Sequence, residues 1–426
     1  MTIIPMNAPD LNRATTRQVT TDASARFTYL TEAIAKTFEP TATQLAELER
    51  AYVATGEYLT ECPEFAGTLT HVHAHGSRQM GTIVRPLDAN REGFDIDLVA
   101  RLSRGAVVRY GGETGPSLLL QHLFAALGRY ADRHGLSIKK WERCVTLTYA
   151  GGMCADFAPV IDDPMHTPAF GEHHGRIPDR ELKHYLATNP KGYCLGFDEI
   201  AKVTPTFRVV EALSYALDSV RRADVEPLPD AQDVLGRLLS RFVQLAKVHR
   251  NHAFADVPNA SRLAPTSVFL TSLIAKAYAI LAPKVHEGPL DLFLDIVELI
   301  PFLFERQAQA GGGEFWFLDN PCALADNLAA SMNTSPRQQA FRQWHERLRS
   351  DLADLLKTIE AGQGADTVAK VVESAFGARA GQAVLAHTAQ RREDLRSAGK
   401  AAFIVGGGSS IVAPARAHTY FGGAHA

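Results

Sequence analysis

The chain has 426 residues, with 44 Lys and Arg against 47 Asp and Glu, and a net charge of −3. This length exceeds one ordinary hydrophobic core, so we expect two lobes. Apolar residues make up 46% and charged residues 21%, which is typical of a globular protein and excludes global disorder. Because basic residues do not outnumber acidic ones, we predict no extended nucleic-acid-binding surface, although a local basic groove stays open.

The cysteines and the apolar segments predict a cytoplasmic protein. Five scattered cysteines without a CxxC pair favour reduced thiols over a disulfide framework or a zinc site. The first residues combine Pro5 with polar side chains and lack the pattern of a signal peptide. The apolar stretch VFLTSLIAKAYAILA is interrupted by Lys276 and falls short of the ~18–20 residues of a membrane span, so we predict no membrane contact.

Residues 1–40 are interpreted as an N-terminal lead and residues 41–205 as a mixed α/β lobe. Thr41-x-x-Gln44 is a capping-box pattern that begins a predicted helix. Alternating or β-branched segments predict strands, and an amphipathic segment that ends at a glycine predicts a second helix. In chain order these are a helix at 41–59, strands at 67–76 and 93–102, a helix at 117–135 and a hairpin at 142–161 that turns at Gly151-Gly152. The pattern indicates a small mixed sheet backed by helices.

The rest of the chain changes character. Residues 163–205 are rich in Pro, Gly, Asp and His, and we predict one short helix there and a turn at 189–192. From 206 to 402 long helical periods predict an all-helical lobe. The helical segments are TFRVVEALSYALDSVRR, DAQDVLGRLLSRFVQLAKVHRNH, PTSVFLTSLIAKAYAIL, PLDLFLDIVELIPFLFE and SPRQQAFRQWHERLRSDLADLLKTIEAG. The Gly-rich residues 403–426 are predicted to be a flexible tail.

Two carboxylates stand close together in the second predicted strand. Residues i and i+2 of a strand project from the same face, so Asp95 and Asp97 lie side by side while Phe94, Ile96 and Leu98 face the other way. Like charges so placed cost energy unless a cation lies between them or one is protonated. The exposed face of an edge strand is the alternative interpretation.

Three further features favour a catalytic site. Gly76-Ser77 follows a strand, so its backbone amides and the Ser77 hydroxyl are suited to the β- and γ-phosphates of a nucleotide. A third carboxylate, Asp156, lies in an apolar strand predicted to neighbour the first two. Oxygen ligands of this kind select Mg²⁺ or Mn²⁺ rather than zinc, and two such ions can activate an attacking hydroxyl and neutralise leaving pyrophosphate. In this scheme Asp95 and Asp97 hold both ions, and Asp156 completes the one that faces the acceptor hydroxyl.

These residues resemble a known family. GSxxxGT at 76–82, DID at 95–97 and the later Asp156 resemble nucleotidyltransferases of the DNA polymerase β superfamily. The segments NPKGY, KVHRNH, PTSVFLTSLIAKAY, NPCALADN and HTYFGG resemble bacterial cGAS/DncV-like nucleotidyltransferases, over about residues 41 to 422. The resemblance implies an α+β protein with a polymerase-β-like core, a helical C-terminal lobe and an active site in the cleft between them. It also implies synthesis of cyclic di- or trinucleotide second messengers in anti-phage defence.

The resemblance also assigns residues and partners. It places the metal triad on Asp95, Asp97 and Asp156, and the phosphate turn on Gly76 and Ser77. Three further residues are implied to bind nucleotide: Thr82, Lys247 and Ser267. The implied partners are NTP substrates, ATP among them, and an effector that responds to the cyclic product. In part of the family an E1/E2-like partner conjugates the enzyme's C-terminus, and the tail HTYFGGAHA is compatible with that role.

Alternative functions stay open at this point. A related core in other transferases modifies a protein, a small molecule or an RNA end, and an RNA-end enzyme should show a basic groove. A catalytically inactive nucleotide sensor is the second alternative, which the intact carboxylate set disfavours. Lys139–Trp141 offers a stacking platform for a base, but a solvated strand start is the preferred interpretation.

Two groups of histidines are candidate zinc ligands. His71, His73 and His75 share one strand face, but no fourth ligand follows at a familiar spacing, so a partly exposed strand face is preferred. His173 and His174 lie in a Gly-flanked loop and are predicted to form a solvated turn rather than a metal site.

Overall fold

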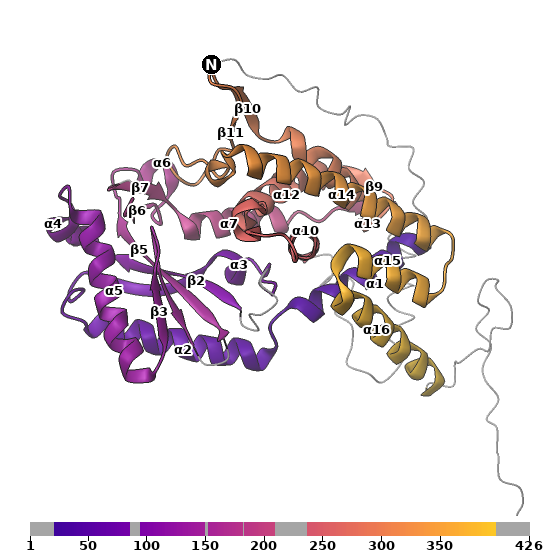
Figure 1. Ribbon diagram of the computed structural model, residues 1–426, viewed down its shortest axis with the longest axis horizontal. Coiled ribbons are helices and arrows are strands. Elements are labelled where there is room, and N and C mark those ends of the chain that lie inside the picture. Colours follow the sequence, from indigo (N-terminus) through magenta and orange to yellow (C-terminus); the bar gives the residue numbers. More distant parts are fainter. Residues whose placement is uncertain (1–20, 86–93, 150–151, 182, 209–236, 398–426) are drawn as a thin grey trace, which may run out of the picture.

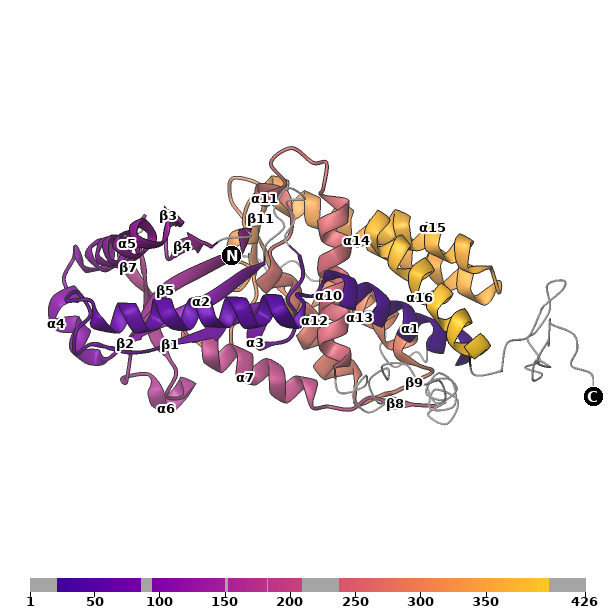
Figure 2. The same cartoon turned by 90° about the horizontal axis from the view of Figure 1, so that it is seen from below.

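A computed structural model describes the protein over residues 21–85, 94–149, 152–181, 183–208 and 237–397. Within these ranges the chain forms a sheet-containing lobe and a helical lobe that lie next to each other (Figures 1 and 2). Each lobe has its own apolar core, as a chain of this length is expected to have. Among the described helices, none is long and apolar enough to span a bilayer.

A seven-stranded sheet organises the first lobe. Its central path runs β1-β2-β5-β4-β3, β6 continues from the far end of β5, and β7 pairs with β6. The pair β2–β5 is parallel and the other pairs are antiparallel. The strands are β1 (Leu69–His75), β2 (Asp95–Leu102), β3 (Ser137–Lys140), β4 (Val145–Thr148), β5 (Cys154–Asp162), β6 (Gly175–Asp179) and β7 (His184–Thr188). The four strands predicted from the sequence are confirmed as β1, β2, β4 and β5.

Two long helices cover one face of this sheet. Helix α2 (Ala42–Glu61) begins with the predicted capping box, in which Thr41 and Gln44 exchange hydrogen bonds. Helix α5 (Gly115–His134) ends at Gly135, whose φ of 64° is left-handed. Their apolar faces pack against alternate residues of the central strands, among them Ile96, Leu98, Ala155 and Phe157. The intervening residues of β2 and β5 therefore face away from α2 and α5.

The second lobe is mainly helical. Its helices are α10 (Leu238–Ala253), α11 (Ala260–Leu263), α12 (Ser267–Leu281), α13 (Pro289–Leu299), α14 (Ser335–Glu360), α15 (Ala365–Phe376) and α16 (Ala378–Ser397). Helices α10, α12, α13 and α14 confirm four predicted helical segments. Most of the fifth prediction, TFRVVEALSYALDSVRR, lies outside the described residues. The lobe also contains two small sheets, formed by β8 (Thr206–Phe207) with β9 (Val285–His286) and by β10 (Glu305–Ala308) with β11 (Glu314–Phe317).

The segment interpreted as an N-terminal lead contains a helix, α1 (Thr21–Phe38), that the sequence did not reveal. Helix α1 packs against α10, α13, α14 and α16, and its apolar residues join the core of the helical lobe. Arg241 of α10 pairs with Glu32 at 2.7 Å and with Glu39, and both Arg241 and Glu32 are almost fully buried. Because an unpaired buried charge is costly, this ion-pair cluster fixes α1 in one position on α10.

The predicted turn at 189–192 was wrong. Asn189 caps helix α7 (Pro190–Ala201), and its side chain accepts a hydrogen bond of 2.8 Å from the Gly192 amide. The preceding residues, predicted as a short helix, form the hairpin of β6 and β7. Asn-Pro occurs in turns, but Asn is also a strong N-cap and Pro is favoured at the first helical position, and this second interpretation is the one realised here.

Candidate active site

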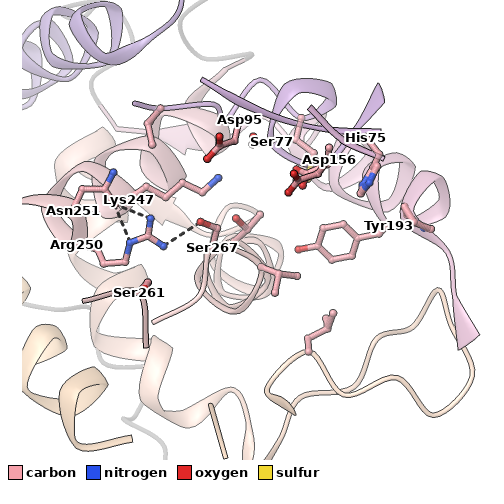
Figure 3. A pocket seen from close by; sticks show the side chains of 18 of the residues that line it. His75, Ser77, Asp95, Asp156, Tyr193, Lys247, Arg250, Asn251, Ser261 and Ser267 are labelled. Atoms are coloured by element: carbon pink, nitrogen blue, oxygen red, sulfur yellow. Dashed lines mark hydrogen bonds between the residues drawn. The ribbon is translucent and has the colours of Figure 1, made fainter. Parts of the chain in front are cut away.

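A cavity of about 1000 Å³ opens between the two lobes. The sheet lobe contributes the end of β1, the following one-turn helix α3 (Gly76–Gln79) and the start of β2. Helices α7, α10 and α12 form the opposite wall, and Figure 3 shows their side chains facing the acidic residues across the space. The residues that line the cavity include His75, Gly76, Ser77, Asp95, Asp97, Asp156, Asn189, Tyr193, Lys247, Arg250, Asn251 and Ser267.

Parallel pairing of β2 with β5 brings the three predicted carboxylates together. Asp97 is directly opposite Asp156 in the register, and Asp95 lies two residues away on the same strand. All three project from the face that α2 and α5 do not cover, and all three line the cavity. The sequence predicted this set correctly as neighbours, although the residues are far apart along the chain.

The position of Asp97 is electrostatically demanding. Burial raises its pKa, Lys247 opposes this rise and the charge of Asp95 adds to it, so that the pKa of Asp97 is about 6. Carboxylates that share one partly buried face are costly unless a cation balances their charge. The donor set consists of oxygens alone, which suits Mg²⁺ or Mn²⁺. The three aspartates are therefore the residues that would hold such ions.

Gly76 is required by its contact with Asp97. In the antiparallel pair of β1 and β2, His75 is opposite Asp97, so the next residue passes directly over the Asp97 carboxylate. Gly76 has a φ of 61°, and a Cβ built on it would overlap Asp97 Oδ2. The chain then continues into α3, which begins with Gly76 and Ser77 at the edge of the cavity. A residue with a side chain would displace both the turn and the carboxylate.

Asp156 is held by a chain of hydrogen bonds from two neighbouring segments. Thr146 of β4 is opposite Asp156, and its hydroxyl donates a short hydrogen bond to Asp156 Oδ1. The indole of Trp141 in turn donates to Thr146 Oγ1 at 2.8 Å, and Lys139 Nζ lies 3.6 Å from the centroid of the Trp141 ring. Trp141, whose sequence context suggested a solvated strand start, therefore orients Asp156 through Thr146.

Lys247 of α10 provides a cation opposite the carboxylates. It is only 3% exposed, and its amine donates to the carbonyl and the hydroxyl of Thr82, each at 3.1 Å. Burial and the charge of Arg250 lower the pKa of Lys247 and Asp97 raises it, so that the pKa is about 7. A polyphosphate bound nearby would favour the protonated amine. Thr82, predicted to bind nucleotide, is fully buried and lies behind the described wall of the cavity, where it positions Lys247.

Arg250 is a cavity residue that the sequence analysis missed. Its guanidinium donates to Ser267 Oγ at 3.1 Å, to the Pro265 carbonyl at 3.0 Å and to Asn251 Oδ1 at 2.7 Å (Figure 3). Ser267, which was predicted to bind nucleotide, thus accepts one of the hydrogen bonds that hold Arg250 in place. Burial lowers the pKa of Arg250 to about 10, so the side chain stays charged at neutral pH. The i,i+3 spacing from Lys247 in KVHRNH was the available signal, because it places both cations on one helical face.

Helix α7 supplies a second group of residues that the sequence analysis missed. Asn189 and Tyr193 line the cavity, and the Tyr193 hydroxyl is 2.7 Å from Ser272 Oγ of α12. Figure 3 shows the Tyr193 ring extending into the space between the lobes. Both residues belong to the NPKGY segment, whose interpretation as a turn concealed that it begins a helix facing the site.

Comparison with known proteins agrees with this geometry. Residues 25–200 match the Second Messenger Oligonucleotide or Dinucleotide Synthetase domain. A c-di-GMP synthase of Roseivirga ehrenbergii is 26% identical over 361 residues, covering 84% of this chain and 86% of its own. Residues 25–200 thus carry the sequence pattern of that domain family. The fold of the chain is similar to that of the CD-NTase CdnG of Bradyrhizobium diazoefficiens in complex with GTP, which matches with a TM-score of 0.59 and 20% identity over 85% of this chain and 98% of that one.

We predict that Gly76→Ala disturbs the active site without unfolding the protein. The variant should lower turnover of NTPs at least ~100-fold, because a displacement of about 1 Å at a reacting centre has that effect. Gly81→Ala is the matched control: Gly81 also has a positive φ of 63°, but a Cβ there has Ser240 Oγ at 3.9 Å as its nearest described contact. Both should lose about 1–2 kcal/mol of stability from backbone strain. Equal activity losses in the two variants would contradict the proposed contact with Asp97.

A second prediction concerns the orientation of Asp156. Thr146→Val keeps the side-chain shape but removes the hydroxyl that donates to Asp156, and should lower kcat about 10- to 100-fold and raise the Mg²⁺ concentration needed. Thr148→Val is the control, since Thr148 shares the strand and its face but contacts Cys154. Steady-state kinetics with a Mg²⁺ titration compares them. An unchanged Mg²⁺ requirement in Thr146→Val would exclude the positioning role.

Proposed function

We propose that the protein joins nucleoside triphosphates, GTP among them, into a cyclic dinucleotide in the cavity between its lobes. The observation that carries the proposal is the opposition of three carboxylates on one wall and two buried cations on the other. This arrangement suits a triphosphate. Its negative charge would be balanced on one side by metal ions bound to the carboxylates and on the other side by Lys247 and Arg250. A trinucleotide ring remains the second product that the same chemistry would give.

The relatives support this product class. One is named for the synthesis of c-di-GMP, and another, from B. diazoefficiens, is named a cyclic dinucleotide synthase and is 29% identical over 174 residues, which is 38% of each chain. The solved CdnG structure contains GTP. A guanine nucleotide is therefore the first substrate to test, although ATP was expected from the sequence.

In the proposed reaction a hydroxyl oxygen of one nucleotide attacks the α-phosphorus of an NTP and pyrophosphate leaves. Mg²⁺ held by Asp95, Asp97 and Asp156 would polarise the reacting groups and neutralise the leaving pyrophosphate. The carboxylate of Asp156, oriented by Thr146, accepts the proton of the attacking hydroxyl. A second attack, by a hydroxyl of the other nucleotide in the linear product, closes the ring and releases a second pyrophosphate.

The other residues of the cavity bind and orient the substrate. The amides of Gly76 and Ser77 and the Ser77 hydroxyl receive the β- and γ-phosphates. Lys247 and Arg250 approach the triphosphate from the helical lobe, and their fixed hydrogen bonds mean that little reorganisation is needed when it binds. Tyr193 offers an aromatic face for a base, since its hydroxyl already has a partner in Ser272.

In the cell we propose that the cyclic product is a second messenger in anti-phage defence, released to activate an effector protein. The C-terminal tail, which lies outside the described residues, is proposed as the segment that an E1/E2-like partner conjugates. Its support is the sequence HTYFGGAHA and the family resemblance.

The proposal predicts a small, phosphatase-resistant product. Purified protein with Mg²⁺ and all four NTPs should yield a cyclic dinucleotide by mass spectrometry, with GTP consumed and two pyrophosphates released per ring. Asp97→Asn should reduce the yield at least ~10³-fold because it weakens the metal site, while leaving the unfolding midpoint unchanged or higher. Label from NTPs on the protein itself or on a long polymer would instead identify one of the alternative transferases.

A further inference from the structure

A second cluster of metal-ligand side chains lies outside the active site, in the connection between β5 and β6. It consists of Asp163, His166 and His174, whose candidate ligand atoms all lie within 4.8 Å of one another. Asp163 directly follows β5, His166 precedes the one-turn helix α6 (Thr167–Phe170), and His174 precedes β6. His166 Nδ1 is 2.9 Å from Asp163 Oδ2, and His174 Nδ1 is 3.9 Å from the same oxygen.

His174 is the decisive residue of this cluster. The prediction that it belongs to a solvated turn was wrong, because the residue is only 1% exposed. Neither ring nitrogen has a hydrogen-bond partner among the described residues, although its ring stacks on Phe170 at a centroid distance of 5.2 Å. A buried imidazole normally has at least one such partner, so these nitrogens are available to a ligand bound at the cluster. Burial also lowers the pKa of His174, which favours the neutral form that coordinates a metal.

We propose that Asp163, His166 and His174 bind a divalent transition metal ion, with Zn²⁺ as the ion best suited to the ligands. Two imidazoles and one carboxylate are a frequent donor set for zinc, and they differ from the all-oxygen set of the active site. The candidate ligand atoms lie within 4.8 Å of one another, and an ion with bonds of about 2.0–2.2 Å would draw them closer together than that limit. The side chain of His166 is 39% exposed, which gives the ion a path from solvent and a position for water.

Neighbouring charges are compatible with a bound cation. Arg176 Nε lies 3.9 Å from Asp163 Oδ2, but its side chain is 40% exposed and can turn toward solvent. Arg101 is engaged elsewhere, with Asp162 at 2.6 Å and with the carbonyl of His173 at 2.8 Å. The hydrogen bond to the His173 carbonyl holds the backbone of the loop. Arg101 therefore supports the loop and does not form an ion pair with Asp163.

The site would connect to the active site through the backbone. The carbonyl of Phe170 accepts a hydrogen bond of 2.9 Å from Asn189, which caps α7 and lines the cavity. A metal that fixes the loop between Asp163 and His174 therefore also fixes the N-terminus of α7. The assigned role is structural: the ion replaces an apolar core in a connection that is otherwise held by hydrogen bonds.

A second group, His286, Asp291 and Asp295, has a similar ligand composition but does not carry the same inference. His286 Nε2 is 2.8 Å from the Leu281 carbonyl, and both aspartates raise the pKa of this histidine. The Leu281 carbonyl therefore engages Nε2, and Nδ1 lies 3.8 Å from Asp291 Oδ2 and 3.5 Å from Asp295 Oδ2, so both ring nitrogens already have polar neighbours.

The test is zinc stoichiometry on the full-length protein. Protein is stripped with EDTA, given Zn²⁺ in the presence of excess Mg²⁺ to occupy the all-oxygen site, dialysed and measured by mass spectrometry of the metal content. His166→Ala and His174→Ala should each hold one zinc equivalent fewer than the wild type and bind it at least ~100-fold more weakly. Co²⁺ in place of Zn²⁺ should give the visible absorption of a histidine-ligated ion in the wild type but in neither of these two variants.

His173→Ala is the matched control, because His173 is the adjacent histidine but contacts Glu172 instead. It should retain the full zinc equivalent and the Co²⁺ spectrum. Circular dichroism checks the fold of each variant, and the half-exposed His166 makes His166→Ala informative even if the buried His174→Ala variant does not fold. Zinc content equal to the wild type in a folded His166→Ala variant, or no zinc in the wild type, overturns the proposal.

Discussion

The structure depends on one electrostatic constraint: three carboxylates share a sheet face whose opposite side is fully apolar. Asp97 and Asp156 are opposite each other in a parallel pair, so neither can move apart without breaking the central ladder. Burial raises the pKa of Asp97, Lys247 opposes this and Asp95 adds to it, and the resulting value is about 6. We propose that bound cations, and a nucleotide that carries them, offset this cost.

The helical lobe can be understood as the second half of this charge balance. Helix α10 is packed on one side against α1 and presents Lys247 and Arg250 to the cavity on another. Both cations are buried and held by hydrogen bonds, to Thr82 and to Ser267 respectively. Thr82 belongs to the sheet lobe, so Lys247 links the lobes at the site itself. Docking of the lobes and assembly of the site are therefore one event rather than two.

The sequence could predict those parts of the site that depend on local patterns. Strand alternation placed Asp95 and Asp97 on one face, and Gly76-Ser77 was recognisable as a candidate phosphate turn because it follows a predicted strand. What local pattern could not provide was the contact made across lobes. Arg250 and Tyr193 lie on helices whose orientation toward the sheet depends on packing, and Asn189-Pro190 was compatible with either a turn or a helix start. Helix α1 was not predicted because its packing involves residues far along the chain, such as Arg241, some two hundred residues later. His174 escaped because loop composition does not reveal burial.

We propose that Asp95, Asp97 and Asp156 jointly hold the ions that act on a bound triphosphate. The most direct measurement is anomalous diffraction from crystals grown with Mn²⁺ and a non-hydrolysable GTP analogue. We expect Mn²⁺ peaks in the cavity within about 2.0–2.3 Å of carboxylate oxygens of all three aspartates. The triphosphate should lie between these Mn²⁺ ions and Lys247. A nucleotide bound in the cavity with no Mn²⁺ on any of these carboxylates would contradict it.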